Sequence, residues 1–317
     1  MTSTNGKRIA TLTLNPAIDG ACDAEKVRPT HKIRTTNEVF DPGGGGINVA
    51  RVIQRLGGEV CALYMAGGMT GDVLDALLTR DGLPHHMLKI AGHTRVSLAV
   101  HERETGCEYR FVPEGPEVSE AEWRACLDVL EDWPCDYLVA SGSLPRGVPD
   151  DFYVQVAKIM ARRGIGFVVD TSGPELKAVL EYGGVLLVKP SLNEIEQLAG
   201  RPLREGTDLE DAAMGIVRAG QAKIVAATMG HEGALLATKE GTLRLPAIEV
   251  EVKSAVGAGD SFVAAMTYAL ANDWPVTDAF RLGLSAGTAA VLTPGTGLCL
   301  AEDVFRLYDG LKAEAAN

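Results

Sequence analysis

The chain has few aromatic residues, few cysteines and no long hydrophobic run. Aromatic residues make up 5% of its 317 residues, whereas 46% are hydrophobic and 23% are charged, the composition of an ordinary globular protein. Its six cysteines include no CxxC pair and no metal-finger spacing, which argues against a disulfide scaffold or a zinc module. Because no 18-residue apolar run and no signal-peptide pattern occurs, we expect a cytoplasmic protein without a membrane partner.

Positive charge is also scarce. Thirty Lys and Arg residues stand against 42 Asp and Glu residues, which gives a formal net charge of −12 at pH 7. Such a chain repels nucleic acid and anionic lipid over long range, so neither is an expected partner. An anionic small molecule would need basic residues gathered where it binds.

Apolar runs of strand length alternate with segments of helical spacing along most of the sequence. This alternation predicts one α/β domain over residues 1–317, in which helices cover a mostly parallel sheet. The expected strands are 9–14, 60–66, 137–140, 166–169, 185–188 and 223–227, and the expected helices include 47–56, 73–78, 123–130, 152–160, 212–217, 261–271 and 278–292.

Two stretches, 20–40 and 94–112, have period-2 patterning instead of helical spacing. Glu104, Thr105 and Gly106 form a plausible turn within the second stretch. We therefore expect antiparallel strands in a small sheet beside the main one. The segments at about 15–41 and 92–113 would form a lid.

The segment SAVGAGDSFVAAM (254–266) places Gly257 and Gly259 before Asp260, which directly precedes an expected helix. Free N–H groups at a helix N-terminus attract phosphate, and glycines let the backbone approach it closely. Asp260 could accept the proton of an attacking hydroxyl. The helix dipole predicts a low pKa for this carboxyl, which phosphoryl transfer tolerates because positioning matters more than strong deprotonation. The alternative is that Asp260 only caps the helix.

The segment DPGGGGINVARVIQRLGG (41–58) contains four consecutive glycines before an amphipathic helix. It is neither a Walker A loop nor GxGxxG. Its backbone could bind the hydroxyls of a sugar, with Asn48 adding an amide, or it could be only a flexible turn. Asp19, just beyond the first strand, could hold two sugar hydroxyls or be a solvated turn residue.

Basic residues gather in the two lid segments. Lys32 and Arg34 lie near Arg28 and His31 in the first, and Arg95 and Arg110 lie in the second. They could bind the phosphate of a sugar phosphate, or they could only keep the sheet soluble.

Two further loops follow buried strands, where α/β proteins bind nucleotides. In VLLVKPSLNE (185–194), Lys189 could pair with phosphate and Glu194 could orient water around Mg²⁺, with Ser191 between them. The two glycines of TMGHEGA (228–234) could let a nucleotide approach the backbone.

Together these segments resemble the phosphofructokinase-B branch of the ribokinase-like sugar kinases, from about residue 8 to the C-terminal helix. AGGMTGD (66–72), SGSLPRGV (141–148) and VDTSG (169–173) belong to the same series of signatures. The resemblance implies a ribokinase-like α/β fold, with a central mostly parallel sheet flanked by helices and a small β-sheet lid. It also implies ATP and Mg²⁺ as cofactors, a K⁺ site and a homodimer formed through the lid.

The resemblance assigns roles by position. It implies Asp260 as the base, with an anion hole at Gly257, Ala258 and Gly259. The implied sugar-phosphate ligands are Asp19, Lys32, Arg34, Gly44, Gly45, Asn48, Arg95 and Ser143. The implied ATP site contains Lys189, Ser191, Thr228, Gly230 and Gly233, with Glu194 near Mg²⁺ through water. The implied K⁺ site is built from backbone oxygens around Ser254, Val256, Ala290, Thr293 and Gly295.

Within the branch, the four glycines and YRFV (109–112) are most similar to the 6-phosphofructokinases. The expected reaction is transfer of the ATP γ-phosphoryl group to the 1-hydroxyl of fructose 6-phosphate. LNPAID and GPEVSE (115–120) are equally typical of 1-phosphofructokinases and tagatose-6-phosphate kinases, which are alternatives. Another alternative is a sugar-phosphate sensor without catalysis, and a third is a dinucleotide-binding oxidoreductase, although no GxGxxG follows the first strand.

Two positions depart from the family pattern. Ser191 stands where Asn is usual after Lys-Pro, so metal or phosphate affinity could be weaker, or Asn193 or a water could substitute. Arg146 stands where a second proline is common.

Overall fold

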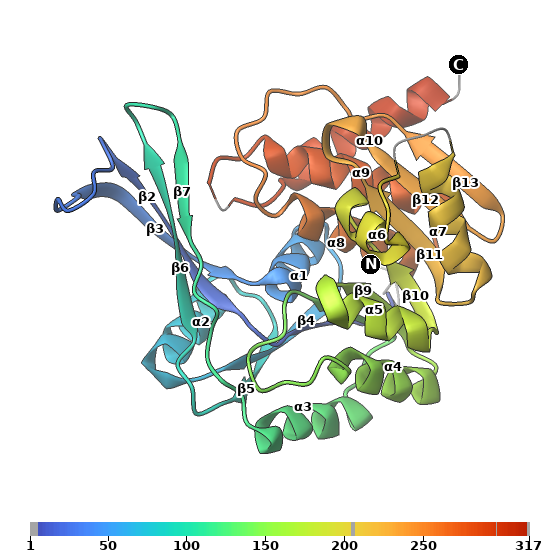
Figure 1. Ribbon diagram of the computed structural model, residues 1–317, viewed down its shortest axis with the longest axis horizontal. Coiled ribbons are helices and arrows are strands. Elements are labelled where there is room, and N and C mark those ends of the chain that lie inside the picture. The colour runs from blue at the N-terminus through green and yellow to red at the C-terminus, as the bar shows by residue number, and fades with distance from the viewer. Residues whose placement is uncertain (1–5, 204–206, 296, 316–317) are drawn as a thin grey trace, which may run out of the picture.

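A computed structural model describes residues 6–203, 207–295 and 297–315, which form two sheets and the helices around them (Figure 1). Among these residues the larger sheet has nine strands, in the order β13-β12-β11-β10-β9-β8-β1-β4-β5. Its strands are β1 (Ile9–Thr13), β4 (Val60–Ala66), β5 (His85–Lys89), β8 (Tyr137–Ser141), β9 (Gly166–Asp170), β10 (Val185–Val188), β11 (Ala222–Thr228), β12 (Ala234–Thr238) and β13 (Gly241–Leu245).

The large sheet is parallel from β5 to β11 and antiparallel at β12 and β13. Successive strand residues pack into different cores: Val139 joins one apolar cluster and Leu138 the other, and both are fully buried. Strands buried on two faces read as continuous apolar runs, which is why the sequence pattern located them.

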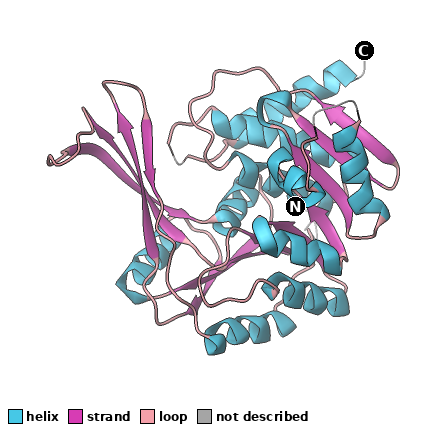
Figure 2. Ribbon diagram, viewed as in Figure 1, coloured by secondary structure: helices cyan, strands magenta, loops and turns pink. Residues whose placement is uncertain are grey.

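Helices cover both faces of this sheet (Figure 2). One apolar cluster contains residues of α1 (Gly45–Arg55), α2 (Gly68–Arg80), α8 (Ala258–Ala271), α9 (Val276–Val291) and α10 (Ala301–Ala315). The other contains residues of α3 (Glu120–Asp132), α4 (Phe152–Arg163), α5 (Gly173–Tyr182), α6 (Leu192–Ala199) and α7 (Asp208–Arg218). Within the described ranges, none of the helices has the length and apolarity needed to cross a membrane.

The small sheet has the order β3-β2-β6-β7 and contains β2 (Ala17–Ala24), β3 (Thr35–Gly43), β6 (Arg95–Glu102) and β7 (Glu108–Phe111). The two outer pairings are antiparallel as expected, but β2 and β6 run parallel. The prediction of antiparallel strands is therefore wrong for the central pair. The reason is that β2 follows β1, β6 follows β5, and β1 and β5 belong to the parallel part of the large sheet, so both chains leave it in the same direction.

The small sheet projects from the rest of the molecule, as Figures 1 and 2 show. Its own core is small: Cys22, Ala24 and Val100 are buried, with Val27 and Leu98 packed against them. Several large apolar side chains on it are exposed by 37–57%: Ile33, Val39, Phe40, Val96, Tyr109, Phe111 and Val112 lie on its strands or directly beside them.

Candidate active site

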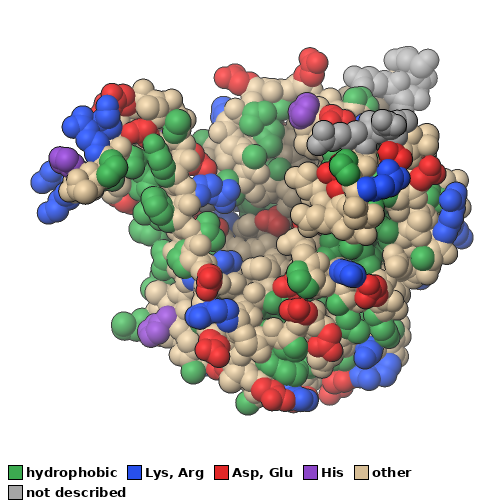
Figure 3. Space-filling model, in the orientation of Figure 1, with side chains coloured by type: hydrophobic (Ala, Val, Ile, Leu, Met, Phe, Trp, Pro, Cys, Tyr) green, Lys and Arg blue, Asp and Glu red, His purple; other side chains and the backbone are tan. Residues whose placement is uncertain are grey.

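A deep hollow separates the small sheet from the large one, and basic and acidic side chains surround it (Figure 3). The carboxyl ends of parallel strands commonly form the ligand site of an α/β sheet. Here Ser141 ends β8, Asp170 ends β9 and Lys189 directly follows β10. These three polar residues are side by side because their strands are neighbours in the sheet.

Asp260 lies inside helix α8 and not in front of it. Gly257 is the N-cap, with φ of 73° and ψ of 3°, so the helix begins at Ala258. A left-handed backbone at this position favours glycine. Both sequence-based readings, an acidic residue before the helix and an Asp N-cap, are therefore corrected: Asp260 belongs to the first helical turn, where backbone N–H groups lack helical partners.

Burial raises the pKa of Asp260 to about 6, and Asp170 adds to this effect. Asn48 Nδ2 donates a hydrogen bond of 2.9 Å to Asp260 Oδ2 and, with Lys189, opposes the rise. The expected low pKa is therefore wrong, because desolvation and a nearby carboxylate outweigh the helix dipole. A carboxyl with a pKa near 6 is a stronger base than an ordinary aspartate.

Lys189 forms an ion pair with Asp170, with 3.1 Å between Nζ and Oδ1. Both side chains are mostly buried. Burial disfavours the charge of Lys189, but Asp170, Glu194 and Asp260 outweigh it and raise the Lys189 pKa. A methyl group at Gly259 would lie 3.4 Å from Lys189 Nζ, so the ammonium group faces the start of α8. Asp170 was missed as a site residue, although the signature VDTSG contains it.

Ser191 caps helix α6. Its Oγ accepts a hydrogen bond from Glu194 N at 3.3 Å, and Glu194 Oε2 accepts one from Ser191 N at 2.6 Å. This reciprocal capping box gives Ser191 a structural role at the start of α6. It also orients Glu194. Arg146, the other departure, is exposed and lies 3.7 Å from Glu114.

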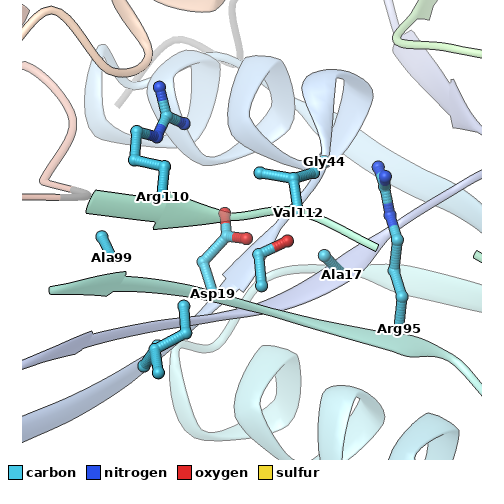
Figure 4. Close-up of a pocket in the computed structure, with 10 residues that line it drawn as sticks. Ala17, Asp19, Gly44, Arg95, Ala99, Arg110 and Val112 are labelled. Carbon is cyan, nitrogen blue, oxygen red and sulfur yellow. The ribbon is translucent and has the colours of Figure 1, made fainter. Parts of the chain in front are cut away.

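Asp19 lies in strand β2, so the alternative of a solvated turn residue is wrong. It lines a cavity of about 160 Å³ with Arg95 and Arg110 (Figure 4). The two guanidinium groups stand on either side of the Asp19 carboxylate. Burial raises the pKa of Asp19, and Arg95, Arg110 and Arg51 oppose this rise.

Arg95 is held in place by two loops. Its Nη1 donates to Pro113 O at 2.9 Å and its Nη2 donates to Asn15 O at 2.8 Å. Its buried Nε has no hydrogen-bond partner among the residues that the structure describes. Asn15 Nδ2 also lies 3.4 Å from the Oγ of Ser143, which is exposed at the same edge. A guanidinium group fixed beside a cavity suits an anionic ligand.

The four glycines are closely packed, which contradicts the flexible-turn reading. A side chain at Gly43 would overlap the Asp19 carboxylate, and one at Gly45 would overlap Ser141 Oγ. Gly44 has φ of 110°, and a methyl group added at Gly46 would lie 2.7 Å from Leu12 O. The run therefore lets the chain pass between β2, β8 and β1.

Lys32 and Arg34 are exposed and lie in the connection between β2 and β3, at the outer end of the small sheet. Neither lines the cavity that contains Asp19. Within one chain the structure does not bring them to the other predicted sugar-phosphate ligands. Arg110, which the sequence analysis named among the basic lid residues but the family resemblance did not assign as a ligand, lines the cavity.

A second cavity, of about 490 Å³, lies beside the start of α8. Thr228, Gly230 and Gly233 line it as expected, and Ala258 and Gly259 join it to the predicted anion hole. The remaining lining is mostly apolar and suits a flat heterocycle: Ala234, Ala247, Ile248, Val250, Val252, Ala255, Phe262, Leu284 and Val291 contribute to it.

The segments predicted to hold K⁺ lie together. Ser254 Oγ donates to Gly295 O at 2.9 Å and accepts from Val256 N at 3.3 Å. Thr293 N donates to Ala290 O at 3.1 Å. Hydroxyl and carbonyl oxygens are ligands that hard cations accept.

Comparisons with known proteins identify the family and the fold. The model of the pfkB family carbohydrate kinases matches residues 13–303. The ATP-dependent 6-phosphofructokinase isozyme 2 of Mycobacterium tuberculosis (strain ATCC 25618 / H37Rv) is 43% identical over 304 residues, which cover 95% of this chain and 89% of that protein. Isozyme 2 of Escherichia coli (strain K12) is 41% identical, over 95% of this chain and 98% of its own. The 1-phosphofructokinase of Borreliella burgdorferi is 30% identical, over 96% and 98%.

The fold matches solved structures as well. Phosphofructokinase-2 from Escherichia coli in complex with potassium has a TM-score of 0.93 and 40% identity, covering 96% of this chain and 99% of that one. The same enzyme in complex with fructose-6-phosphate has a TM-score of 0.91 and 39% identity, with the same coverage. These matches confirm the ribokinase-like α/β fold and exclude the oxidoreductase alternative. The chain belongs to the pfkB family of carbohydrate kinases.

Proposed function

We propose that the chain transfers the γ-phosphoryl group of ATP to the 1-hydroxyl of fructose 6-phosphate. The observation that carries the proposal is the position of Asp260 next to residues that line one cavity or adjoin the other. The anion hole beside it lines the larger apolar cavity, and its partner Asn48 lies on the helix that begins next to Gly44 of the smaller, charged cavity. A base near both a nucleotide site and a sugar-phosphate site fits in-line transfer.

Each task in the proposed reaction is assigned to a particular group of the protein. Asp19 accepts hydrogen bonds from sugar hydroxyls, while Arg95 and Arg110 neutralise the 6-phosphate. Asp260 takes the proton of the attacking 1-hydroxyl. The amides at Gly257 to Gly259, with the Lys189 ammonium group, bear the charge that develops on the transferred group.

Two cations fit the residues that are present. Asp170 and Glu194 both act electrostatically on Lys189 and offer the oxygen ligands that Mg²⁺ prefers, directly or through water. Bound Mg²⁺ would neutralise phosphate charge. K⁺ would bind beside the anion hole and stabilise the loops that carry the hole. Its ligands would be oxygens of Ser254, Val256, Ala290, Thr293 and Gly295.

The positive charge of the smaller cavity supports a phosphorylated acceptor, because among the described residues two arginines and only one carboxylate, that of Asp19, line it, and an anionic phosphate would balance this charge whereas a neutral sugar would not. The 6-phosphofructokinases compared above are 41–43% identical to this chain, whereas the 1-phosphofructokinase is 30% identical. This difference favours fructose 6-phosphate over fructose 1-phosphate.

A coupled ADP-release assay with Mg-ATP tests the proposal. Fructose 6-phosphate is expected to give the highest kcat/KM, ahead of fructose 1-phosphate, tagatose 6-phosphate and unphosphorylated fructose. A higher value for another phosphorylated sugar would keep the mechanism and change the substrate. No ADP release with any of the four would favour a sensor without catalysis.

The exposed apolar side chains of the small sheet support a homodimer formed through it, since contiguous apolar surface of this kind marks interaction sites. In such a dimer, Lys32 and Arg34 would reach the partner's sugar phosphate from the outer end of the sheet. Sedimentation analysis at assay concentrations is expected to find a dimer. Fully active monomers would contradict this arrangement.

A cytoplasmic location is part of the same proposal. All six cysteines are free thiols in the structure, as the reducing cytoplasm favours.

The rate is expected to fall in acid because Asp260 must be deprotonated to act as a base. Its pKa is raised to about 6, so the carboxylate predominates at pH 7 and becomes the minor form at pH 5. In saturating substrates, log kcat should decline with unit slope below about pH 6. A kcat that stays constant down to pH 4.5 would remove Asp260 as the base.

Gly43→Ala is expected to lower kcat/KM for fructose 6-phosphate by about 100-fold, because the added methyl group overlaps the Asp19 carboxylate and displaces it. The KM for ATP should stay within about twofold. Gly215→Ala is the matched control, since this helical glycine of α7 has open space around it. Steady-state kinetics of both variants check the prediction, and equal effects would contradict it.

A further inference from the structure

Arg51 is a nearly buried cation that the proposed reaction does not use. It lies on α1 and is 8% exposed. Its Nη1 donates to Pro42 O at 3.0 Å, and its Nη2 lies 3.5 Å from both Asp41 Oδ1 and Asp81 Oδ2. A buried guanidinium group is costly unless it is paired in this way, so a specific arrangement depends on it.

Two of these partners belong to the end of strand β3 that adjoins the site. Asp41 stands opposite Asp19 in the β2–β3 pairing, and Gly43, two residues on, packs against the Asp19 carboxylate. Arg51 therefore holds the short backbone segment on which Asp19 rests. It also acts on Asp19 electrostatically, opposing the effect of burial on the Asp19 pKa.

Helix α1 also contacts Asp260, the proposed base. Asn48 precedes Arg51 by three residues, which places both on neighbouring positions of one helical surface. Asn48 Nδ2 donates to Asp260 on α8, and α1 lies between the small sheet and α8 (Figure 1). One rigid helix thus contacts the segment that supports Asp19 through Arg51 and contacts Asp260 through Asn48.

We infer that Arg51 is a positioning residue that sets Asp19 relative to Asp260. The inference rests on the proposed function, in which Asp19 holds the sugar and Asp260 takes its proton. A misplacement of about 1 Å between a bound substrate and its base can cost about 100-fold in rate. The contacts of Arg51 with Asp41 and Pro42 fix β3 to α1 and so limit such a displacement.

Arg51→Gln is the first variant to measure. We expect the Kd for fructose 6-phosphate to rise about tenfold, the loss of ~1.4 kcal/mol of binding free energy. We expect kcat to fall about tenfold as well, while the KM for ATP stays within about twofold. Arg51→Lys should recover part of the loss, because lysine keeps the charge but lacks the planar fork that reaches several acceptors.

Asp41→Asn and Asp81→Asn form a matched pair. Both carboxylates lie 3.5 Å from Arg51 and have similar side-chain exposure, 21% and 24%, and both also face Arg80, at 3.8 Å from Asp41 and 3.0 Å from Asp81. Only Asp41 belongs to β3, whereas Asp81 follows α2. Asp41→Asn should raise the Kd for fructose 6-phosphate and lower kcat, as Arg51→Gln does. Asp81→Asn should lower the melting temperature by a similar amount and leave Kd and kcat near wild type.

A double-mutant cycle decides whether Arg51 acts through Asp19. Calorimetry would measure binding of fructose 6-phosphate to wild type, Arg51→Gln, Asp19→Asn and the double variant. In the Asp19→Asn background, Arg51→Gln should cost less than about twofold in Kd. Additive losses, or equal losses of sugar binding in Asp41→Asn and Asp81→Asn, would overturn the inference. If Arg51→Gln does not fold, the matched Asp pair alone supports or overturns it.

Measuring wild type in parallel distinguishes a failure of the proposed function from a failure of the inference about Arg51. If wild type prefers another sugar phosphate in the four-sugar assay, the proposed substrate fails and the same cycle is run with the preferred acceptor. If wild type uses fructose 6-phosphate but Arg51→Gln matches it, the inference about Arg51 fails and the proposed function stands.

Discussion

Asp260→Asn is expected to lower kcat by about 10³-fold, because general base catalysis contributes about 10² to 10⁴ and the variant lacks a proton acceptor. Asn is nearly isosteric with Asp, and its amide oxygen can still accept the hydrogen bond from Asn48. The Kd values for ATP and fructose 6-phosphate should therefore stay within about threefold. Rapid-quench kinetics with equilibrium binding would measure both.

The same variant is expected to be more stable than wild type at pH 7. The Asp260 pKa is raised from 3.8 to about 6 on folding, so this group favours the folded state below pH 4 and loses that contribution as pH rises through 6. A neutral Asn avoids burying a carboxylate beside Asp170. Thermal unfolding should show a higher melting temperature for Asp260→Asn at pH 7 and a smaller difference at pH 4.

Two results would contradict this role. Full kcat in Asp260→Asn would show that another group or water accepts the proton. A large fall in melting temperature at pH 7 would show that the carboxylate is structural, and the loss of rate would then carry no information about catalysis.

Lys189→Met is expected to reduce kcat/KM for ATP by about 100-fold or more, because it removes the ammonium group that faces Gly259 and the anion hole. It should also destabilise the fold by about 3–5 kcal/mol, since the Asp170 carboxylate is then buried without a counter-charge. Steady-state kinetics and denaturant titration would measure the two effects.

The double variant Lys189→Met/Asp170→Asn separates the effect on catalysis from the effect on stability. Removing the second charge eliminates the unpaired carboxylate, so most of the lost stability should return while kcat/KM for ATP stays low. Recovery of activity together with stability would contradict a direct role for Lys189 in transfer. Asp170→Asn alone is the control, because it keeps the lysine and removes its partner.

Several features of the protein could be read from the chain alone. Strands buried on two faces appear as apolar runs such as VLLV (185–188), and helices as amphipathic repeats, so the central strands of the large sheet were predictable, whereas β5, β12 and β13 were not among the expected strands. Asp19, Asn48, Lys189 and Asp260 were identified through segments whose order and spacing match one family. Short segments of this kind carry information because a backbone that must approach a phosphate or a sugar closely restricts which residues can stand there.

Other features depended on which segments meet in space. The parallel pairing of β2 and β6 follows from the strands that precede them, and the run of four glycines is needed because β1, β2 and β8 pass close by. The Asp260 pKa near 6 depends on burial and on Asp170, 90 residues earlier in the chain. Arg51 gains its positioning role through Asp41 and Pro42 of β3, which lie about ten residues before it in the chain. Sequence patterns report local periodicity and backbone needs, whereas desolvation and charge pairing depend on distances that only the tertiary structure establishes.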